Sequence, residues 1–482
     1  MLMEGVPPPS DPIENKHGDP MYADDDLKAE LDNTPVDDPF GNEATAEVKY
    51  KTLKWWQCGM FMIAESVSLG VLSLPATLDT LGFVPALILI VGLGILALYT
   101  GMVIGQFRER HPHIHNLADA GEILMGRFGR ELFGLGQILF SIFIMGSHIV
   151  TFTVMMNTIT EHGTCSIVFS IVGMVICLVL SLPRTIKNMT YISIASFISI
   201  FSAVMITMIG VGVQYKGGTS IYATQQTNIY HGFTAVTNIV FAYCAHVAFF
   251  GLIAEMEEPK DFTKALCLLQ GFEIALYVTA ATVIYYYVGT GVASPALGSA
   301  GPVLKKVAYG VAIPTIIGAG VVNGHVGLKY IYVRIFRKSG RMAKRDFVSV
   351  GSWVGIGVTC WIIAWIIGEG IPSFTNIVSL IVCGSLLALL RRNLERKIFA
   401  NRYQKQSSLF ASWFTYGLSG VYWLHMNWGY WFSSPRKIAL TILNFLIVGI
   451  GGTICGLGLY ASGKAIHDDS SRASFTCANN AD

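Results

Sequence analysis

Residues 62–75 read MIAESVSLGVLSLP, an apolar stretch that is interrupted by a glutamate, three serines, a glycine and a proline. Glycine and serine weaken an α-helix, while Pro75 removes an amide donor and disfavours helical geometry at the residue before it. Irregular backbone at membrane depth is tolerated only where it lines a cavity or packs inside protein. The stretch therefore predicts a transmembrane helix that is broken near its middle.

The composition of the whole chain is that of a membrane protein. Of its 482 residues, 52% are hydrophobic and 13% are charged, whereas a soluble domain carries about a quarter charged residues. Because a helix needs about 20 apolar residues to cross a bilayer, we expect an all-α polytopic membrane protein with about 11 transmembrane helices. The expected spans are residues 55–78, 82–107, 131–159, 166–182, 190–213, 232–254, 265–290, 307–335, 347–368, 373–390 and 437–461.

Residues 411–432 leave the number of spans open. They are apolar and contain four tryptophans among several glycines. Tryptophan gathers at the membrane–water interface, so the stretch favours an interfacial segment, with a twelfth crossing as the alternative.

The distribution of charge divides the chain and orients it. Residues 1–48 hold 13 acidic residues, two lysines and seven prolines, which predicts a disordered acidic tail. Residues 49–466 form the expected transmembrane domain, and residues 467–482 a short C-terminal tail. Placing the first tail in the cytoplasm puts 26 of the remaining basic residues on that side and five on the other. The positive-inside rule therefore predicts a cytoplasmic N-terminus.

The sequence carries no pattern typical of catalysis or of a metal site. His111, His113 and His115 lie in a polar loop that offers no scaffold for a metal ion. Most cysteines stand in apolar runs and favour packing roles. Cys165 and Cys477 lie outside the expected spans, and their spacing does not indicate whether they pair. We expect neither an enzyme nor a cofactor, metal or nucleic-acid partner, so a secondary transporter is the default interpretation.

Several motifs extend this interpretation, in the same order as in a known family. They are residues 72–76 (LSLPA), 181–184 (SLPR), 189–193 (MTYIS), 241–246 (FAYCAH), 255–262, 329–334 (KYIYVR) and 456–462 (GLGLYAS). Together they resemble the amino acid/auxin permease family, in its fungal neutral amino acid permease branch, over about residues 51–465. The resemblance implies a LeuT-like fold, in which spans 1–5 and 6–10 form an inverted repeat, plus one extra helix. It also implies a break in span 6, although residues 233–250 contain no glycine or proline.

The resemblance implies a secondary active transporter of neutral amino acids, aliphatic ones and, as an open alternative, aromatic ones. We expect proton-coupled symport by alternating access, with an amino acid, a proton and the lipid bilayer as partners. The expected location is the plasma membrane, with the vacuolar membrane as the alternative. A vacuolar exporter or exchanger, or a receptor that senses amino acids without moving them, are the other interpretations. The oligomeric state is left open.

Glu65 is the first candidate residue, because an acidic side chain near the middle of a span is costly to bury. It would carry the proton or face a substrate ammonium, or else hold the broken segment by a hydrogen bond. His246 would line the site or relay protons, with inter-helix packing as the alternative, and Asn323 would contribute to coupling. The other expected substrate-binding residues are Ser66, Ser68, Leu69, Gly70, Phe241 and Tyr243. Glu273 is expected near the cytoplasmic end of its span, in a structural role.

Overall fold

The computed structural model describes residues 50–184, 186–215, 217, 219–337, 346–370, 413–468 and 475–479. This part of the chain is almost entirely helical. It contains seven helices long and apolar enough to cross a membrane, or nine if each of two bent helix pairs is one span. The predicted all-α membrane fold is confirmed, whereas the number eleven is not. The acidic tail of residues 1–48 and the expected span at 373–390 lie outside the described residues.

The other ten expected spans coincide with described helices. The first five are α2 (Trp55–Leu81), α3 (Phe83–Arg110), α4 (Leu117–Thr160), α5 (Ser166–Leu180) and α6 (Ile186–Gln214). The next are α7 (Ile229–Ala242), α8 (His246–Glu255), α9 (Phe262–Val288), α10 (Pro302–Val311), α11 (Ile313–Phe336) and α12 (Phe347–Gly370). The chain ends with α15 (Leu418–Met426) and α16 (Pro435–Asp468), and its short turns are η1 (Pro259–Asp261), η2 (Ala296–Ala300) and η4 (Trp413–Gly417).

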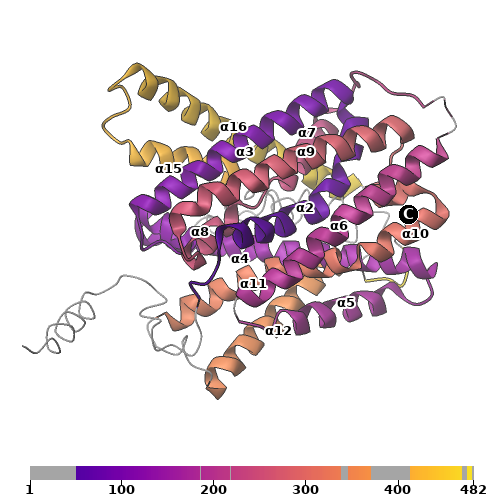
Figure 1. Ribbon diagram of the computed structural model, residues 1–482, viewed down its shortest axis with the longest axis horizontal. Helices are drawn as coiled ribbons and strands as arrows, with labels where there is room; N and C mark the ends of the chain where they lie inside the picture. The colour runs from indigo at the N-terminus through magenta and orange to yellow at the C-terminus, as the bar shows by residue number, and fades with distance from the viewer. Residues whose placement is uncertain are drawn as a thin grey trace, which may run out of the picture.

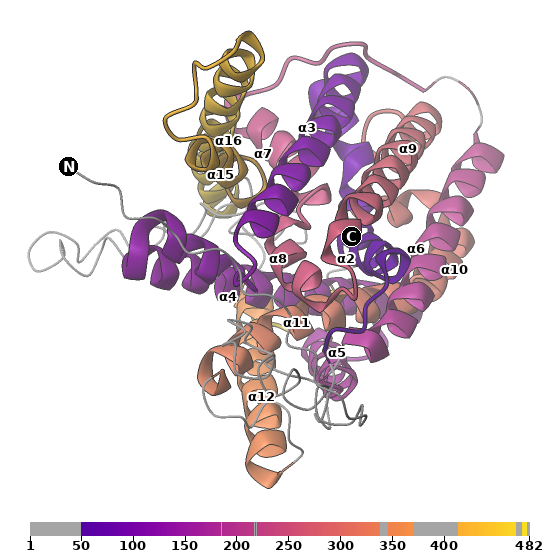
Figure 2. The same cartoon turned by 60° about the vertical axis from the view of Figure 1, so that its left-hand side comes forward.

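Helix α2 occupies the centre of the bundle (Figure 1). It packs against α6, α7, α9 and α11, which surround it. Helices α15 and α16 lie together on one side, against α3 and α7, and α12 lies on another side against α4, α5 and α11 (Figure 2). The segment that the sequence predicts to be broken therefore lies at the enclosed centre of the described helices.

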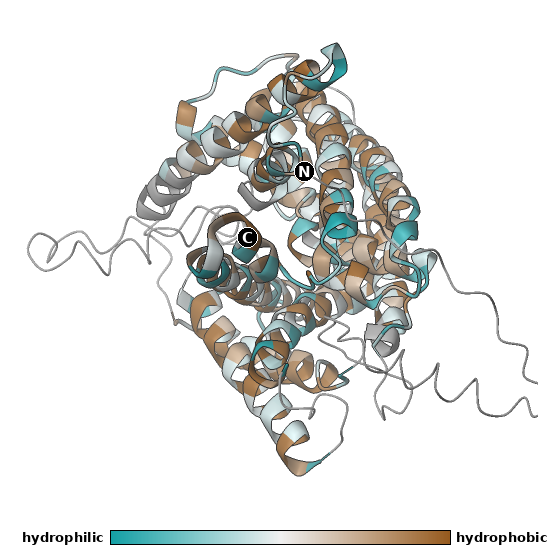
Figure 3. Ribbon diagram, turned by 90° about the vertical axis from the view of Figure 1, so that its left-hand side faces the viewer, coloured by the Kyte–Doolittle hydropathy of each residue, from teal (hydrophilic) through white to brown (hydrophobic). Residues whose placement is uncertain are grey.

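The outward faces of the helices are apolar, as Figure 3 shows by the hydrophobic colour that extends along them. Large side chains such as Ile88, Ile209 and Val213 are more than half exposed. Exposing apolar surface to water costs about 25 cal/mol per Å², whereas the bilayer core imposes no such cost. These faces therefore suit contact with lipid.

Helix α4 contains a kink that separates its first turns, residues 117–124, from the longer part of the helix. Met125 and Gly126 leave helical geometry, and Gly126 has φ +62°, a conformation that favours glycine. Before the kink, the Asn116 side chain caps the helix by accepting a hydrogen bond from the Asp119 amide at 2.9 Å. The kink thus allows residues 117–124 to run in a different direction from the span.

The interpretation of residues 411–432 as an interfacial segment is wrong for residues 413–426. Here η4 and α15 pack against α3 and α16, and Tyr416 and Tyr422 are fully buried. The Tyr416 hydroxyl donates to the Leu93 carbonyl at 3.2 Å. The aromatic content that favoured an interface serves instead to fill the bundle, while Trp428 and Tyr430 beyond α15 are exposed.

Cys165 and Cys477 form a disulfide that ties the C-terminal residues to the start of α5. Beside it, the Ser166 hydroxyl donates to the Ala478 carbonyl at 2.6 Å. The Phe475 amide donates to the Glu369 carbonyl near the end of α12, at 3.4 Å. Residues 475–479 therefore lie across the ends of two helices that are far apart in the sequence.

Candidate functional site

The site begins at the bend in α2. Its two halves, Trp55–Ser68 and Gly70–Leu81, meet at an angle of 45°, which confirms the predicted break. Pro75 has no backbone N–H, so it cannot donate a helical hydrogen bond to the carbonyl one turn earlier. Close to this position, the Ser73 hydroxyl donates a hydrogen bond to the Gly70 carbonyl at 2.9 Å. The bend places Leu69 between the half-helices, with Ser66 and Ser68 buried just before it.

A second break separates α7 from α8 at residues 243–245. The resemblance implied this break, and the structure confirms it. A side chain from a neighbouring helix replaces one lost helical hydrogen bond, because the Tyr277 hydroxyl of α9 donates to the Ala242 carbonyl at 2.8 Å. Tyr243, within the break, is fixed by its own hydroxyl, which donates to the Ile90 carbonyl of α3 at 2.9 Å. The break is therefore imposed by tertiary contacts rather than by local sequence.

The two breaks touch each other. A Cβ atom placed on Gly70 would lie 2.6 Å from the Cα atom of Ala242. Only a residue without a side chain allows this approach. Gly70 is thus required for contact between the bends of α2 and of α7–α8, and Phe241, which is 8% exposed, lies beside this contact.

Glu65 lies one turn before the bend and is 7% exposed. Within the described part of the chain, its buried Oε2 atom has no hydrogen-bond partner. An unpartnered carboxylate oxygen in a dry interior costs several kcal/mol by order of magnitude. Such a group requires either a proton or a positively charged ligand, which makes Glu65 a candidate for binding either of them at the breaks.

Glu273 is the residue that sequence reasoning missed. It is fully buried in α9, accepts a hydrogen bond from the Ser66 hydroxyl, and accepts another from the Gln270 amide at 2.9 Å. The expectation of a structural residue near the cytoplasmic end is therefore wrong about its position. Because α9 begins at Phe262, a rise of about 1.5 Å per residue places Glu273 about 16 Å along the helix, near half the bilayer core.

His246 and Asn323 are held by neighbours outside the breaks. The His246 Nε2 atom lies 2.9 Å from the Thr100 hydroxyl and 3.1 Å from the Ala97 carbonyl, both in α3. This geometry corresponds to the packing alternative for His246. The Asn323 amide donates to the Ala319 carbonyl within α11 at 3.0 Å. The structure thus brings together Glu65, Ser66, Ser68, Leu69, Gly70, Phe241 and Tyr243 and turns His246 toward α3.

The N-terminal end of α2 is tied to α8 and α11. The amides of Thr52 and Leu53 donate to the Glu255 carbonyl at 3.1 and 3.0 Å. The Glu255 carboxylate forms a buried ion pair with Lys329, and the Lys329 ammonium lies 4.4 Å from the centre of the Tyr50 ring. These contacts close this end of the site.

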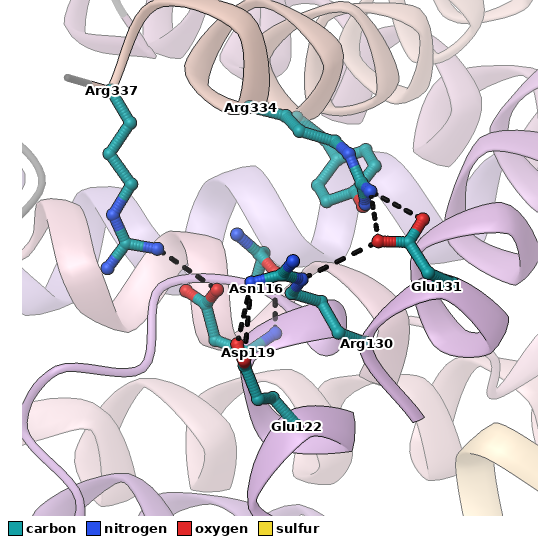
Figure 4. A network of polar contacts seen from close by, with 8 residues as sticks. Asn116, Asp119, Glu122, Arg130, Glu131, Arg334 and Arg337 are labelled. Atoms are coloured by element: carbon teal, nitrogen blue, oxygen red, sulfur yellow. Dashed lines mark hydrogen bonds and ion pairs between the residues drawn. The ribbon is translucent and has the colours of Figure 1, made fainter. Parts of the chain in front are cut away.

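A charged network surrounds a cavity of about 690 Å³ beside this closure (Figure 4). It joins α4 to the end of α11, and its acidic members pair with arginines. Burial tends to raise the pKa of Asp119, but hydrogen bonds from His115 and the charge of Arg337 outweigh it and hold the pKa low. The closest contacts are Arg337–Asp119 at 3.1 Å, Arg334–Glu131 at 2.6 Å and Arg130–Glu122 at 3.2 Å.

The other end of α2 is held by backbone contacts. The amides of Phe83 and Val84 donate to the carbonyls of Tyr222 and Ala223, both at 3.0 Å. The Asp79 carboxylate accepts a hydrogen bond from the Gly291 amide at 3.0 Å. Since both ends of α2 are tied to neighbouring elements, the breaks are enclosed in this structure.

Comparison with known proteins gives consistent matches. Residues 51–390 match the family model described as transmembrane amino acid transporter protein. The "N amino acid transport system protein" of Neurospora crassa is 35% identical over 430 residues, 87% of this chain and 86% of the relative. A "transmembrane transporter" of Gibberella moniliformis is 33% identical, over 70% of this chain and 73% of its own. Among solved structures, a Na⁺-coupled sialic acid symporter aligns with a TM-score of 0.51 at 11% identity, covering 84% and 90% of the two chains.

The contact between the breaks generates a first prediction. Gly70→Ala places a methyl group against the α7 backbone, so the breaks must separate. We expect a loss of about 1–3 kcal/mol in stability and a decrease of about 10- to 100-fold in transport. Gly92→Ala is the control, because a Cβ atom there meets nothing within 4 Å. Melting temperature and uptake measure the two effects, and equal behaviour of the two variants would contradict the contact.

The buried ion pair generates a second prediction. Lys329→Gln leaves the Glu255 carboxylate without its cation, which costs about 3–5 kcal/mol. The double variant Lys329→Gln/Glu255→Gln removes both charges and should recover most of this loss, because no uncompensated charge is left. Melting temperatures of the purified variants measure the recovery. A double variant as unstable as the sum of the single variants would show that the two charges act independently.

Proposed function

The chain belongs to the transmembrane amino acid transporter family and has a LeuT-like transporter fold; from this premise we propose that it is a proton-coupled symporter of neutral amino acids. The observation that carries the proposal is the contact between two broken helices next to Glu65, a buried carboxyl group with an unpartnered oxygen. The substrate and the proton would then bind at the same place in the protein.

The ends of the half-helices support recognition of an amino acid. The half-helix that begins at Gly70 directs the positive end of its dipole toward the bend. Helix α7 ends at Ala242 and directs its negative end there. A substrate carboxylate and ammonium would find opposite partial charges at the same place, as in other transporters with discontinuous helices.

The surroundings of the breaks favour a neutral side chain. Phe241, Ala242 and Val67 are apolar and buried, whereas the acidic groups in the centre are Glu65 and Glu273. An acidic substrate side chain would meet like charges in a medium of low dielectric constant. Acidic amino acids should therefore be excluded, and both aliphatic and aromatic neutral amino acids remain substrates to be tested.

Coupling to a proton is favoured by the chemistry of Glu65. A proton satisfies its buried oxygen without requiring the several oxygen ligands that a metal cation needs. Alternating access would expose Glu65 to one side and then to the other, with the contacts at the two ends of α2 opening in turn. Transport then requires differential binding in the two states and no covalent chemistry.

Orientation in the membrane has support from the disulfide. Disulfides persist in oxidising compartments and are rare in the cytosol, so the Cys165–Cys477 face would be extracellular or lumenal. This agrees with the cytoplasmic N-terminus predicted from the basic residues. We propose the plasma membrane as the location; the vacuolar membrane would present the same face to the lumen and correspond to an exporter or exchanger.

Replacing Glu65 tests the proton coupling. In liposomes containing the full-length chain, Glu65→Gln should abolish accumulation of a labelled neutral amino acid under an imposed pH gradient and reduce exchange less. Glu161→Gln, an exposed glutamate after α4, is the matched control. Stimulation of the wild type by a sodium gradient alone would refute proton coupling. Binding without counterflow would identify a sensor instead of a transporter.

The disulfide gives a test of orientation. Maleimide–polyethylene glycol should add two more tags to the denatured wild type after reduction than before it. A membrane-impermeant reductant applied to intact cells should produce the same gain if this face is extracellular. The variant Cys165→Ser/Cys477→Ser should show no gain. Full tagging of the wild type without reductant would remove the support for this orientation.

A further inference from the structure

Glu273 connects the two helix breaks from a third helix, α9. Its carboxyl group accepts a hydrogen bond from the hydroxyl of Ser66, which lies in α2 next to Glu65. One turn further along α9, the Tyr277 hydroxyl donates to the Ala242 carbonyl at the end of α7. Two side chains on one face of α9, the Glu273 carboxyl group and the Tyr277 hydroxyl, are thus bonded to the two breaks.

Glu65 and Glu273 lie at the same buried α2–α9 interface, because Ser66, the neighbour of Glu65 in the chain, donates a hydrogen bond to Glu273. The other titratable groups that face Glu273 are the phenols of Tyr277, Tyr243 and Tyr416. Cys58 and Cys244 are the thiols near Glu65. Among the described residues, no lysine, arginine or histidine forms an ion pair with either carboxyl group.

Two buried carboxylates without a cation cannot both stay ionised, because like charges repel strongly at low dielectric constant. Such a pair retains at least one proton and titrates as a unit rather than as two independent groups. A carboxylate only accepts hydrogen bonds, whereas a carboxylic acid also donates one. A change in the protonation of Glu273 therefore changes its hydrogen bond with Ser66 at the bend of α2, one turn along α9 from Tyr277, which is bonded to the other break.

We infer that Glu65 and Glu273 together hold the transported proton, and that Glu273 links its uptake and release to the geometry of both breaks. This rests on the proposed proton symport and adds a second coupling residue to it. The step is proton transfer alone: the pair gains a proton from one side of the membrane and loses it to the other. No group is oxidised or reduced. Ser66 and Tyr277 act as positioning residues.

The test compares Glu273→Gln and Glu273→Asp with the wild type, reconstituted as full-length chains with a trapped pH indicator and labelled leucine. With one coupled proton, a gradient of one pH unit supports about tenfold accumulation. Glu273→Gln should accumulate no leucine above the external level and carry no protons inward with it. Counterflow of leucine should persist at a measurable, reduced rate. Glu273→Asp, which keeps the carboxyl group, should recover part of the accumulation. Gel filtration and melting temperature confirm folding.

The outcomes separate this inference from the proposed function. A wild type without proton influx overturns the proposed symport and the inference together. If the wild type accumulates leucine and Glu273→Gln accumulates it equally well, the inference alone is overturned. Equal loss of counterflow and accumulation in a folded Glu273→Gln would assign the residue to substrate binding and also overturn the inference.

Discussion

The hydrogen bond from the Tyr277 hydroxyl to the Ala242 carbonyl satisfies a constraint on which the rest of the structure depends. In a bilayer, backbone groups released by a broken helix have no water to bond and must find partners inside the protein. Helix α9 supplies such a partner through Tyr277, while the hydroxyl of Tyr243 anchors the break to the α3 backbone. The breaks can therefore persist at the centre of the molecule, and α2, which carries one of them, is surrounded by other helices.

The sequence was sufficient to predict the features that depend on local chemistry. Hydropathy located ten spans that coincide with described helices, and Ser66, Gly70 and Pro75 predicted the break in α2. The break at residues 243–245 could not be derived in this way, because no glycine or proline marks it and a tyrosine from another helix stabilises it. The same holds for the disulfide between Cys165 and Cys477, whose partners are 312 residues apart and are joined only by the fold.

Glu273 and residues 413–426 show why burial was the harder quantity to predict. Both were assigned to the edge of the membrane from residue type and approximate span limits. Counting from the observed start of α9 places Glu273 near mid-bilayer, and three-dimensional packing places Tyr416 and Tyr422 inside the bundle. Aromatic residues are common both at interfaces and in cores, so composition does not distinguish the two environments.

The closed ends of α2 and the buried acidic pair support a common interpretation. Lys329 pairs with Glu255 at the closure beside the N-terminal end of α2, and this buried pair has no net charge without any ligand. The breaks have no such internal cation among the described residues, and their neutrality depends on a proton or a substrate ammonium. The closure needs no ligand to neutralise its ion pair, whereas the centre needs a proton or a cation from the solution. The centre is therefore where occupancy by ligands can bias the opening of one end over the other.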